Sequence, residues 1–298
     1  MELKIDDTIV EVRRPRDVDE YRKIMDVQAD IWGMPDYSEA VTYHLLIAAD
    51  RHGGLVLGAF EKHTGKPIGM VFGFPAFYEG KLIHYSHMAG VIQKYRFKGI
   101  GYLLKLEQRK YVLEQGLDLI VWTYDPLQAA NAKFNVGKLG VIVRRFYKDY
   151  YGELRNSINV GMPTDRFKAE WWIKSKRVTE RIKGYKEPKM EDVIDAGGVV
   201  VTKTVKRNDI TVLVGYDLNC TSDIVIAEIP KSLDELRPYR DELLKWRFGL
   251  REVFINYLGR GYIVADVVTV SENGRKRVFY VLWRTSLENV LEGKAPWT

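Results

Sequence analysis

The chain has 298 residues, which at roughly 150 residues per domain predicts about two domains. Hydrophobic residues make up 46% and charged residues 29%, a balance that is typical of a globular protein and excludes a wholly disordered or fibrous chain. The net charge of +6 suits an anionic ligand but does not require nucleic acid.

Cysteine and histidine usage limits the metal and redox chemistry. Cys220 is the only cysteine, so no internal disulfide and no cysteine-rich zinc site can form. We expect a cytoplasmic protein with no membrane partner, because the N-terminus lacks the apolar run of a signal peptide and no segment reaches the ~18 apolar residues of a membrane span. The histidines show no metal-ligand spacing, and His84 and His87 would point to opposite faces of a strand. No metal is predicted.

The first half begins with a strand and two helices. Residues 8–14 alternate as strands do, and residues 16–32 carry an apolar stripe at helical spacing. Ser38 is the candidate N-cap of a second helix, which the glycines after His52 would end. Segments of hairpin-turn composition separate the next extended runs. These runs predict three consecutive antiparallel strands, at residues 54–60, 67–77 and 81–92.

The pattern then changes to helices around a single strand. Residues 93–116 read as a loop that feeds a helix, with apolar side chains within about a 100° arc. Residues 117–125 are apolar and β-branched, as in a buried strand, and Pro126 opens a further helix that ends near Gly140. The basic stretch 164–188 has a helix-like period.

A break at residues 184–196 predicts the domain boundary. We expect a first domain at residues 1–183 and a C-terminal α+β lobe at residues 184–298. Its elements are short strands near residues 199–205, 210–216 and 223–230, a long helix from about Leu233 to Leu258, and strands near residues 261–270 and 277–284.

The loop before the predicted helix carries the most informative motif. Gly99 and Gly101 would let the backbone approach a ligand closely, and the first free N–H groups of the helix would point at an anion. Arg96 and Lys98, with Lys94 close by, could add charge-assisted hydrogen bonds to a phosphate or pyrophosphate. A tight turn with basic residues that face water is an equally good interpretation of this spacing, because Gly-x-Gly pairs are weak motifs.

Two known phosphate loops do not fit. The P-loop pattern is absent, and the antiparallel strands before the loop do not suit a dinucleotide-binding unit. The segment Arg96-Phe97-Lys98-Gly99-Ile100-Gly101 matches [QR]xxGx[GA] after a fourth strand, and the segment from Asp125 to Gly140, DPLQAANAKFNVGKLG, stands where a second motif is expected. In these features the sequence resembles the GNAT N-acetyltransferase superfamily over about half the chain, and an uncharacterised two-part branch of it.

The resemblance implies a fold and a cofactor. The implied fold is α/β (α+β), with a mixed, mostly antiparallel sheet flanked by helices, and the C-terminal lobe would be a degenerate half of similar kind. The implied co-substrate is acetyl-CoA or another acyl-CoA, and a backbone N–H near Met88 to Gly90 would polarise the thioester carbonyl. The cofactor-binding residues implied are Met88, Ala89, Gly90, Val91, Ile92, Arg96, Lys98, Gly99, Ile100, Gly101, Tyr102, Asn131 and Phe134. For Phe134, plain core packing is an equal alternative.

Acceptor chemistry requires a neutral amine. At pH 7 roughly a tenth of a typical α-amino group is neutral, but far less of a lysine side chain. Candidate general bases are Glu79, His84 and His87, of which His87 is nearest the expected thioester. Each alone is more often a surface or core residue, and deprotonation through water would leave no essential base.

In the family that the sequence resembles, a tyrosine is the acid that protonates the leaving thiolate. Val136 occupies that place here if the turn at residues 138–140 is aligned with the family's turn. Tyr147 is the candidate substitute, and Tyr124, Tyr150 and Tyr151 are alternatives by sequence proximity. A thiolate of ordinary pKa can also leave unaided.

Three functional hypotheses follow. The first is an N-acyltransferase acting on a small-molecule amine or amino acid, either as a monomer or as a homodimer. The second is an acyl-CoA sensor without catalysis, and the third is an RNA- or ribosome-associated modifier suggested by basic and aromatic residues at 166–186. Arg247 and Arg251 on the long helix could meet an acidic substrate, although such arginines are more often a solvated face with ion pairs.

Overall fold

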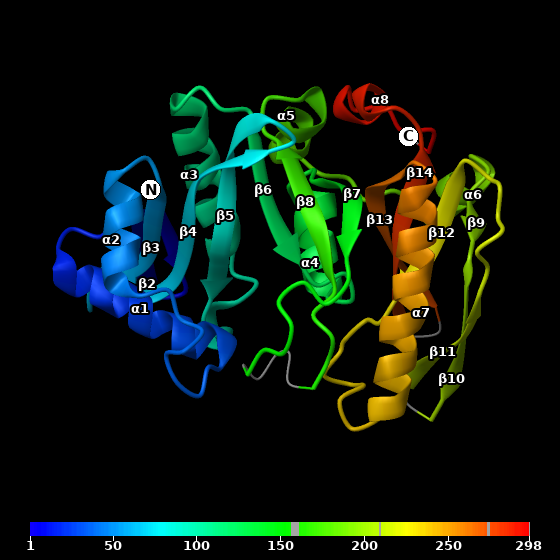
Figure 1. The fold of residues 1–298 in the computed structure, drawn as a ribbon, viewed down its shortest axis with the longest axis horizontal. Helices are drawn as coiled ribbons and strands as arrows, with labels where there is room; N and C mark the ends of the chain where they lie inside the picture. The colour runs from blue at the N-terminus through cyan, green and yellow to red at the C-terminus, as the bar shows by residue number, and fades with distance from the viewer. Residues whose placement is uncertain (156–160, 209, 273–274, 298) are drawn as a thin grey trace. The chain divides into compact units, whose positions relative to one another are not determined.

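The computed structural model describes residues 1–155, 161–208, 210–272 and 275–297. The chain divides into two compact units, the first formed by residues 1–122 with 153–161 and the second by residues 123–152 with 162–298. Both units consist of a sheet with flanking helices (Figure 1). The mixed α/β fold class predicted from the sequence is therefore confirmed.

The first unit holds a sheet with the strand order β1-β2-β3-β4-β5-β6. Its neighbouring strands run antiparallel, except β5 and β6, which are parallel. The chain passes into the second unit within β6. The elements are β1 (Glu2–Ile5), β2 (Thr8–Arg13), α1 (Val18–Trp32), α2 (Tyr43–Arg51), β3 (Leu55–Glu61), β4 (Pro67–Tyr78), β5 (Lys81–Val91), η1 (Gln93–Tyr95), α3 (Ile100–Glu114) and β6 (Leu119–Tyr124).

Helices cover both faces of this sheet, because the strand side chains alternate between two apolar clusters. On β3, Val56 packs with α1 and α2, whereas Leu55 and Leu57 pack with α3. On β4, Phe72 lies on the α1 side and Val71 on the α3 side. We call these the α1 face and the α3 face.

One prediction about the helix ends of this unit, the N-cap of the second helix, is wrong. Asp17 caps α1 through the backbone N–H of Glu20, and Gly33 ends it in the left-handed conformation. Ser38, predicted to cap the second helix, lies in the preceding loop, and α2 instead begins after Thr42 without a side-chain cap. Apolar packing of Leu46 therefore holds this helix in place of a cap.

The second unit holds a sheet with the strand order β8-β7-β13-β14-β12-β9 and a separate hairpin of β10 and β11. The long helix α7 contacts β11, β7, β13 and β12. The elements are α4 (Ala129–Ala132), η2 (Lys133–Lys138), β7 (Ile142–Tyr147), β8 (Arg166–Trp172), α5 (Lys176–Lys183), α6 (Met190–Asp195), β9 (Val199–Val200), β10 (Thr202–Arg207), β11 (Ile210–Tyr216), β12 (Ile224–Ile229), α7 (Arg240–Gly259), β13 (Tyr262–Glu272), β14 (Arg275–Arg284) and α8 (Leu287–Leu291).

Two sequence predictions fail in this unit. Residues 164–188, predicted to be helical throughout, begin with strand β8, whose charged residues share a helix-like period with those of the following helix α5. A helix forms only from Lys176, where Ser175 accepts a hydrogen bond from the Val178 N–H. The long helix begins at Arg240 and not near Leu233, since Pro238 would break a helix at that place.

The topology around α7 differs from that around α3. β5 and β6 are neighbours in the first unit, whereas β14 lies between the parallel strands β12 and β13 in the second. β13 also pairs with β7 at Val264 and Val143, so segments on both sides of the predicted boundary at residue 183 share one compact unit. A cofactor-binding domain ending at residue 183 remains a prediction.

Candidate active site

The two parallel strands of the first unit part from each other near the middle of β5. Among the described residues, β5 pairs with β6 only at His84 with Ile120 and at Tyr85 with Val121. Beyond this point β5 continues to pair with β4, up to Val91 with Gly69. The edge of β5 from Ser86 onward therefore has no pairing with β6, and this stretch includes the residues from Met88 that the resemblance implies bind the cofactor.

A β-bulge marks the place where the strands part. Phe72 pairs with Met88 but Phe74 pairs with Tyr85, so two residues of β5, Ser86 and His87, lie opposite one residue of β4. Bulges re-aim side chains and interrupt the hydrogen-bond ladder. Ser86 is buried and His87 is exposed.

Backbone alternation identifies the groups at the open edge. The N–H of Ile92 donates to Ile68 O on β4 at 3.0 Å, so the groups of Ile92, Gly90 and Met88 face β4. Those of Ala89 and Val91 then face away from β4, and the Val91 carbonyl accepts a hydrogen bond from Arg96 Nε at 3.1 Å. The Ala89 N–H is therefore the best-placed donor for a thioester oxygen.

The end of helix α1 packs against the same stretch of β5. A Cβ on Gly90 would overlap Ile31 Cγ2 and lie 3.3 Å from the Trp32 ring. Arg96 Nη2 donates to the Ile31 carbonyl at 2.9 Å. Glycine at position 90 is thus required for the close approach of α1.

Helix α3 begins beside this edge with its first N–H groups available. Gly99, at φ +91°, is the N-cap and supplies no side-chain cap, and the first turn contains no acidic residue. Added Cβ atoms at Gly99 and Gly101 would meet nothing closer than 3.6 Å and 3.9 Å. An anion can therefore approach the N–H groups of Ile100, Gly101 and Tyr102 and the positive end of the helix dipole.

The basic side chains of the loop have structural partners. The Arg96 guanidinium holds the loop to the Val91 and Ile31 carbonyls, so we assign it a positioning role as well as a charge. Lys98 Nζ pairs with Asp6 at 2.7 Å, in an exposed ion pair that a phosphate could exchange into. Phe97, between them, is 91% exposed at φ +64°.

His87 lies on the α1 face among three aromatic rings. Its ring centroid is 6.0 Å from that of Phe72, 6.1 Å from that of Phe74 and 6.2 Å from that of Tyr85. The residue is exposed to solvent, yet these rings desolvate the imidazole and lower its pKa below the ordinary 6.5. His87 is therefore neutral at pH 7 and able to accept a proton.

The other two candidate bases are placed elsewhere. His84 is fully buried on the α3 face, on the opposite side of the strand from His87, and burial together with Lys105 lowers its pKa to about 3. Glu79 lies in the turn between β4 and β5, seven residues before Ser86 and so about 23 Å away along an extended strand. His87 alone of the three lies at the bulge.

The remaining predicted cofactor residues belong to the second unit. Asn131 on α4 is exposed, and Phe134 on the π-helical segment η2 is half-buried. Val136 is fully buried, and its side chain has no proton to donate to a leaving group. A π-helical segment often marks a functional site, but no pattern in the sequence predicted this one.

The candidate tyrosines also lie in the second unit. Tyr124 is buried with its hydroxyl 3.5 Å from that of Tyr280, and burial raises its pKa strongly, so it is a poor proton donor. Tyr147 on β7 is half-buried, with its ring 5.3 Å from that of Tyr150 and Lys168 Nζ over it at 5.6 Å. Tyr151 donates or accepts a hydrogen bond with Thr123. Tyr147 remains a prediction as the acid.

Arg247 and Arg251 do not form a solvated face. Arg247 makes two hydrogen bonds to the buried Asp125 carboxylate, at 2.8 and 2.7 Å, and Arg251 makes two to Asp165, at 2.9 and 2.8 Å. Burial acts to raise the pKa of Asp125, but the Arg247 charge lowers it below the ordinary value. Inside the second unit, Arg247 thus joins α7 to the segment just after β6, and Arg251 joins it to the segment just before β8.

The described residues hold neither a candidate metal site nor a candidate membrane-spanning helix. No cluster of three or more His, Cys, Asp or Glu side chains there could hold a metal ion. No helix in the described ranges combines the length and the apolarity needed to cross a membrane.

Comparison with solved structures shows similarity to one class of fold. No protein-family model and no curated protein matches the chain. A putative GNAT-family acetyltransferase from Desulfovibrio desulfuricans is 18% identical, with a TM-score of 0.42, over 55% of this chain and 99% of that one. A putative acetyltransferase from Acinetobacter baylyi is 19% identical, with a TM-score of 0.45, over 56% and 93%.

A third match is the ribosomal-protein-S18-alanine N-acetyltransferase from Escherichia coli, at 12% identity and a TM-score of 0.42, over 55% of this chain and 94% of that one. Each of these matches spans a little over half of this chain. The GNAT-like fold implied by the sequence resemblance stays a prediction.

Proposed function

We propose that the chain is an acyl-CoA-dependent N-acyltransferase that transfers an acetyl group to a primary amine of a small molecule or amino acid. The observation that carries this proposal is the open edge of β5, which starts at a bulge beside His87 and leads to the uncapped N-terminus of α3. One end suits a reacting carbonyl and the other suits a pyrophosphate.

We call the stretch from the β5 bulge to the N-terminus of α3 the cofactor slot, and each of its two ends has a distinct task. The N–H groups of Ile100, Gly101 and Tyr102 bind the pyrophosphate at the dipole end of α3, and Lys98 exchanges from Asp6 to the phosphate. Bound acetyl-CoA supplies an activated thioester carbonyl. The Ala89 N–H donates to the carbonyl oxygen, where negative charge develops as the amine attacks.

Proton transfer from the amine is assigned to His87. Its imidazole is neutral at pH 7 because aromatic rings desolvate it, so it accepts the proton from the attacking nitrogen directly or through one water. The nitrogen–carbon bond forms and the carbon–sulfur bond breaks, and the thiolate takes a proton from solvent, since a thiolate of ordinary pKa can leave unaided. An α-amino acceptor suits such a base better than a lysine side chain, since its pKa is closer to 7.

The test is a thiol-release assay with acetyl-CoA and a panel of amino acids, small amines and peptides with free N-termini. We expect turnover with at least one free amine, and an acetylated product whose mass increases by one acetyl group. His87→Gln should lower kcat, whereas His63→Gln, a change at an exposed histidine in the β3–β4 turn, should not. Binding of CoA without turnover on any amine would favour the sensor hypothesis instead.

A further inference from the structure

A buried polar cluster lies directly beneath the bulge, on the α3 face of β5. Lys105 Nζ donates to Ser86 Oγ at 3.1 Å and to Gln108 Oε1 at 2.6 Å, and Ser86 Oγ also donates to Gln108 Oε1 at 3.1 Å. Gln108 Nε2 lies 3.1 Å from His84 Nε2. All four side chains are buried, and all belong to the first unit. We call them the Lys105 cluster.

Lys105 is the unusual member of this cluster. It is 3% exposed, and its ammonium lies 3.8 Å from the centroid of the Trp122 ring on β6. Burial lowers its pKa to about 7. An apolar side chain of similar length would avoid the desolvation cost of a buried amine. The chain therefore retains a lysine where stability alone favours methionine.

The hydrogen bonds also fix the protonation of His84. The amide nitrogen of Gln108 can only donate, so His84 Nε2 must accept, and the proton of the neutral ring is on Nδ1. That Nδ1 is buried and has no partner among the described residues. Gly73, opposite the bulge, makes room for this arrangement, because a Cβ there would overlap His84 Nε2 and lie 2.7 Å from the Tyr85 carbonyl.

The cluster connects the two ends of the proposed cofactor slot. Ser86 is one of the two bulge residues, and His87 follows it on the opposite face. Lys105 and Gln108 lie one turn apart on α3, and Lys105 is about 8 Å along the helix axis from Ile100, where the helix begins. The hydrogen bonds to Ser86 thereby hold the bulge in a fixed position relative to the start of α3.

We propose that Lys105 is a positioning residue that acts through Ser86, locking the bulge so that His87 and the Ala89 N–H meet the thioester while α3 holds the pyrophosphate. This inference rests on the proposed function. Lys105 itself is buried and bonded to Ser86 and Gln108, so it is assigned no contact with the substrate. Its loss should loosen the thioester end of the slot and leave the pyrophosphate end intact.

The experiment compares two probes by calorimetry, acetyl-CoA and 3′-phosphoadenosine 5′-diphosphate, which has the pyrophosphate but no pantetheine arm. Lys105→Met should weaken acetyl-CoA binding about tenfold, the effect of one lost hydrogen bond to a charged group, and change the second probe less than about twofold. Ser86→Ala should have the same selective effect. The double variant should be no weaker than the single ones, because the two side chains act as one unit.

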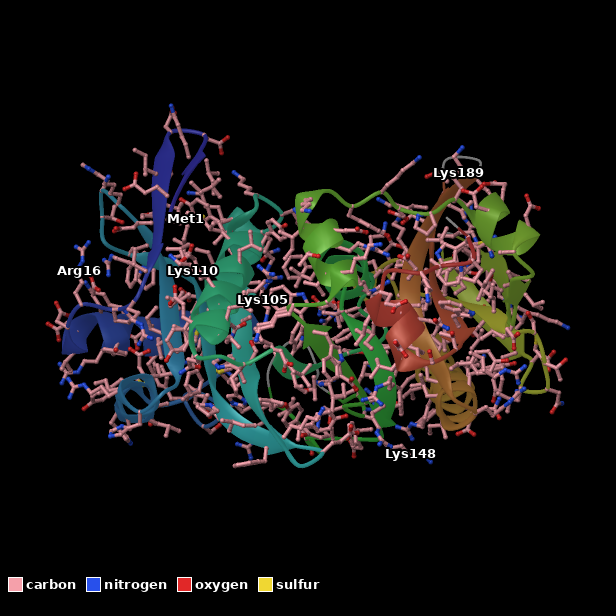
Figure 2. All side chains as sticks on the ribbon, turned by 90° about the horizontal axis from the view of Figure 1, so that it is seen from above. Met1, Arg16, Lys105, Lys110, Lys148 and Lys189 are labelled. Atoms are coloured by element: carbon pink, nitrogen blue, oxygen red, sulfur yellow. The ribbon has the colours of Figure 1, made fainter. Side chains whose placement is uncertain are left out.

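The matched control is Lys110→Met, a change at an exposed lysine on the same helix (Figure 2). It should leave both affinities unchanged. Equal loss of both probes in Lys105→Met, or no loss of acetyl-CoA binding, would overturn the inference. If Lys105→Met does not fold, Ser86→Ala decides between the same outcomes. Failure of the wild-type chain to bind either probe would overturn the proposed function and the inference with it.

A pH series adds a readout that a merely structural role would not move. The groups around Lys105 are His84 on β5, Gln108 and Tyr111 on α3, and Trp122 on β6. Of these, His84 does not titrate near neutrality because burial lowers its pKa to about 3. The terminal phosphate of the second probe titrates with a pKa of about 6 and acetyl-CoA lacks this group, so the affinity ratio of the two probes in the wild type is divided by the same ratio in Lys105→Met. This quotient should change between pH 6 and 8.5, and a flat quotient would contradict the assignment.

Discussion

At the level of single residues, the proposed chemistry depends on two adjacent side chains, one exposed and one buried. His87 and Ser86 are adjacent in sequence, but the bulge directs one to the α1 face and the other to the α3 face. The first is exposed between aromatic rings and the second belongs to the Lys105 cluster. Substitutions at these two adjacent bulge residues can therefore separate proton transfer from positioning.

We predict that His87→Gln lowers kcat about a hundredfold at constant KM for acetyl-CoA, since general-base catalysis contributes roughly that much. The desolvated His87 has a pKa below 6.5, so it loses its base function only when the pH falls below that value. The wild-type rate should thus show an acid limb below pH 6.5. Dividing the wild-type pH–rate profile by that of His87→Gln, measured with the same amine, cancels the titration of the acceptor. The quotient should still contain the acid limb. A flat quotient would contradict the role of His87.

A second prediction concerns the stability of the Lys105→Met variant. The lysine pKa is lowered from 10.5 to about 7 in the folded chain, so between these values the unfolded chain binds more protons and wild-type stability rises with pH. The free energy of unfolding of the variant, relative to wild type, should be highest at pH 7 and below. It should then fall by up to about 1.4 kcal/mol per pH unit above pH 7. Urea titrations at pH 6, 7, 8 and 9 measure this trend, and a difference independent of pH would refute it.

The sequence could name His87 but not the Lys105 cluster. A lysine among leucines on an amphipathic helix looks like a residue at the edge of the apolar face, and only the tertiary pairing of β5 with α3 shows that it is buried. Val136 was identified from the resemblance as lacking the tyrosine, and its full burial agrees with the absence of a catalytic role. Arg96 was assigned to the pyrophosphate from its charge, whereas its contacts with two carbonyls needed coordinates.

At the level of elements, glycines determine how closely the strands and helices of the first unit approach. Gly73 lies opposite the bulge and Gly90 lies under the end of α1, and a Cβ at either position would overlap a neighbouring side chain. Neither glycine requires a positive φ, so turn propensity does not explain them. Close packing does, which is why a sequence pattern could not distinguish them from the turn glycines.

We predict that Gly73→Ala destabilises the fold by about 1–3 kcal/mol, because the added methyl group must displace His84 or the Tyr85 carbonyl. The expected observation is a lower midpoint of urea unfolding with an unchanged slope. Gly259→Ala near the end of α7 is the control, since a Cβ there meets nothing within 4 Å and alanine favours the helix. Equal stability of the Gly73 variant and wild type would show that the cluster adjusts freely.

Element prediction succeeded where turn residues bound a single apolar run. The helix α1 and the strands β3, β4 and β12 were predicted within a few residues, although β3 and β12 are buried on both faces. Strand β8 was missed because its charged residues and those of the following helix α5 together have a helix-like period, and strand β7 was not predicted at all. Period alone does not separate a short strand from a helix that follows it closely.

At the scale of the whole molecule, ion pairs between distant segments hold the second unit together. The carboxylate of Asp125, just after β6, forms an ion pair with the guanidinium of Arg247 on α7, which lies 122 residues later in the sequence. Arg181 of α5 pairs in the same way with the buried Asp266 of β13 at 2.6 Å. No sequence pattern indicates such pairs, because each partner alone resembles an ordinary surface charge.

We predict that Arg247→Met destabilises the chain by about 3–5 kcal/mol, since it leaves Asp125 buried without its counter-charge. The double variant with Asp125→Asn should recover part of this loss, and a thermodynamic cycle of unfolding free energies measures the coupling. Arg237→Ala, which breaks the exposed pair with Asp234, should cost less than about 1 kcal/mol. Similar losses in the two single-arginine variants would contradict a special role for the buried pair.

The pairing of β7 with β13 has a practical consequence for dissecting the protein. A fragment that stops at residue 183 would keep β7 but lose its neighbour, leaving Ile142 and Val143, both fully buried in the intact chain, at an uncovered sheet edge. Such edges recruit other chains, so the fragment should aggregate on expression even if its cofactor slot is complete. The C-terminal lobe thus covers this sheet edge, and recombinant work on the proposed cofactor-binding part should include residues 184–298.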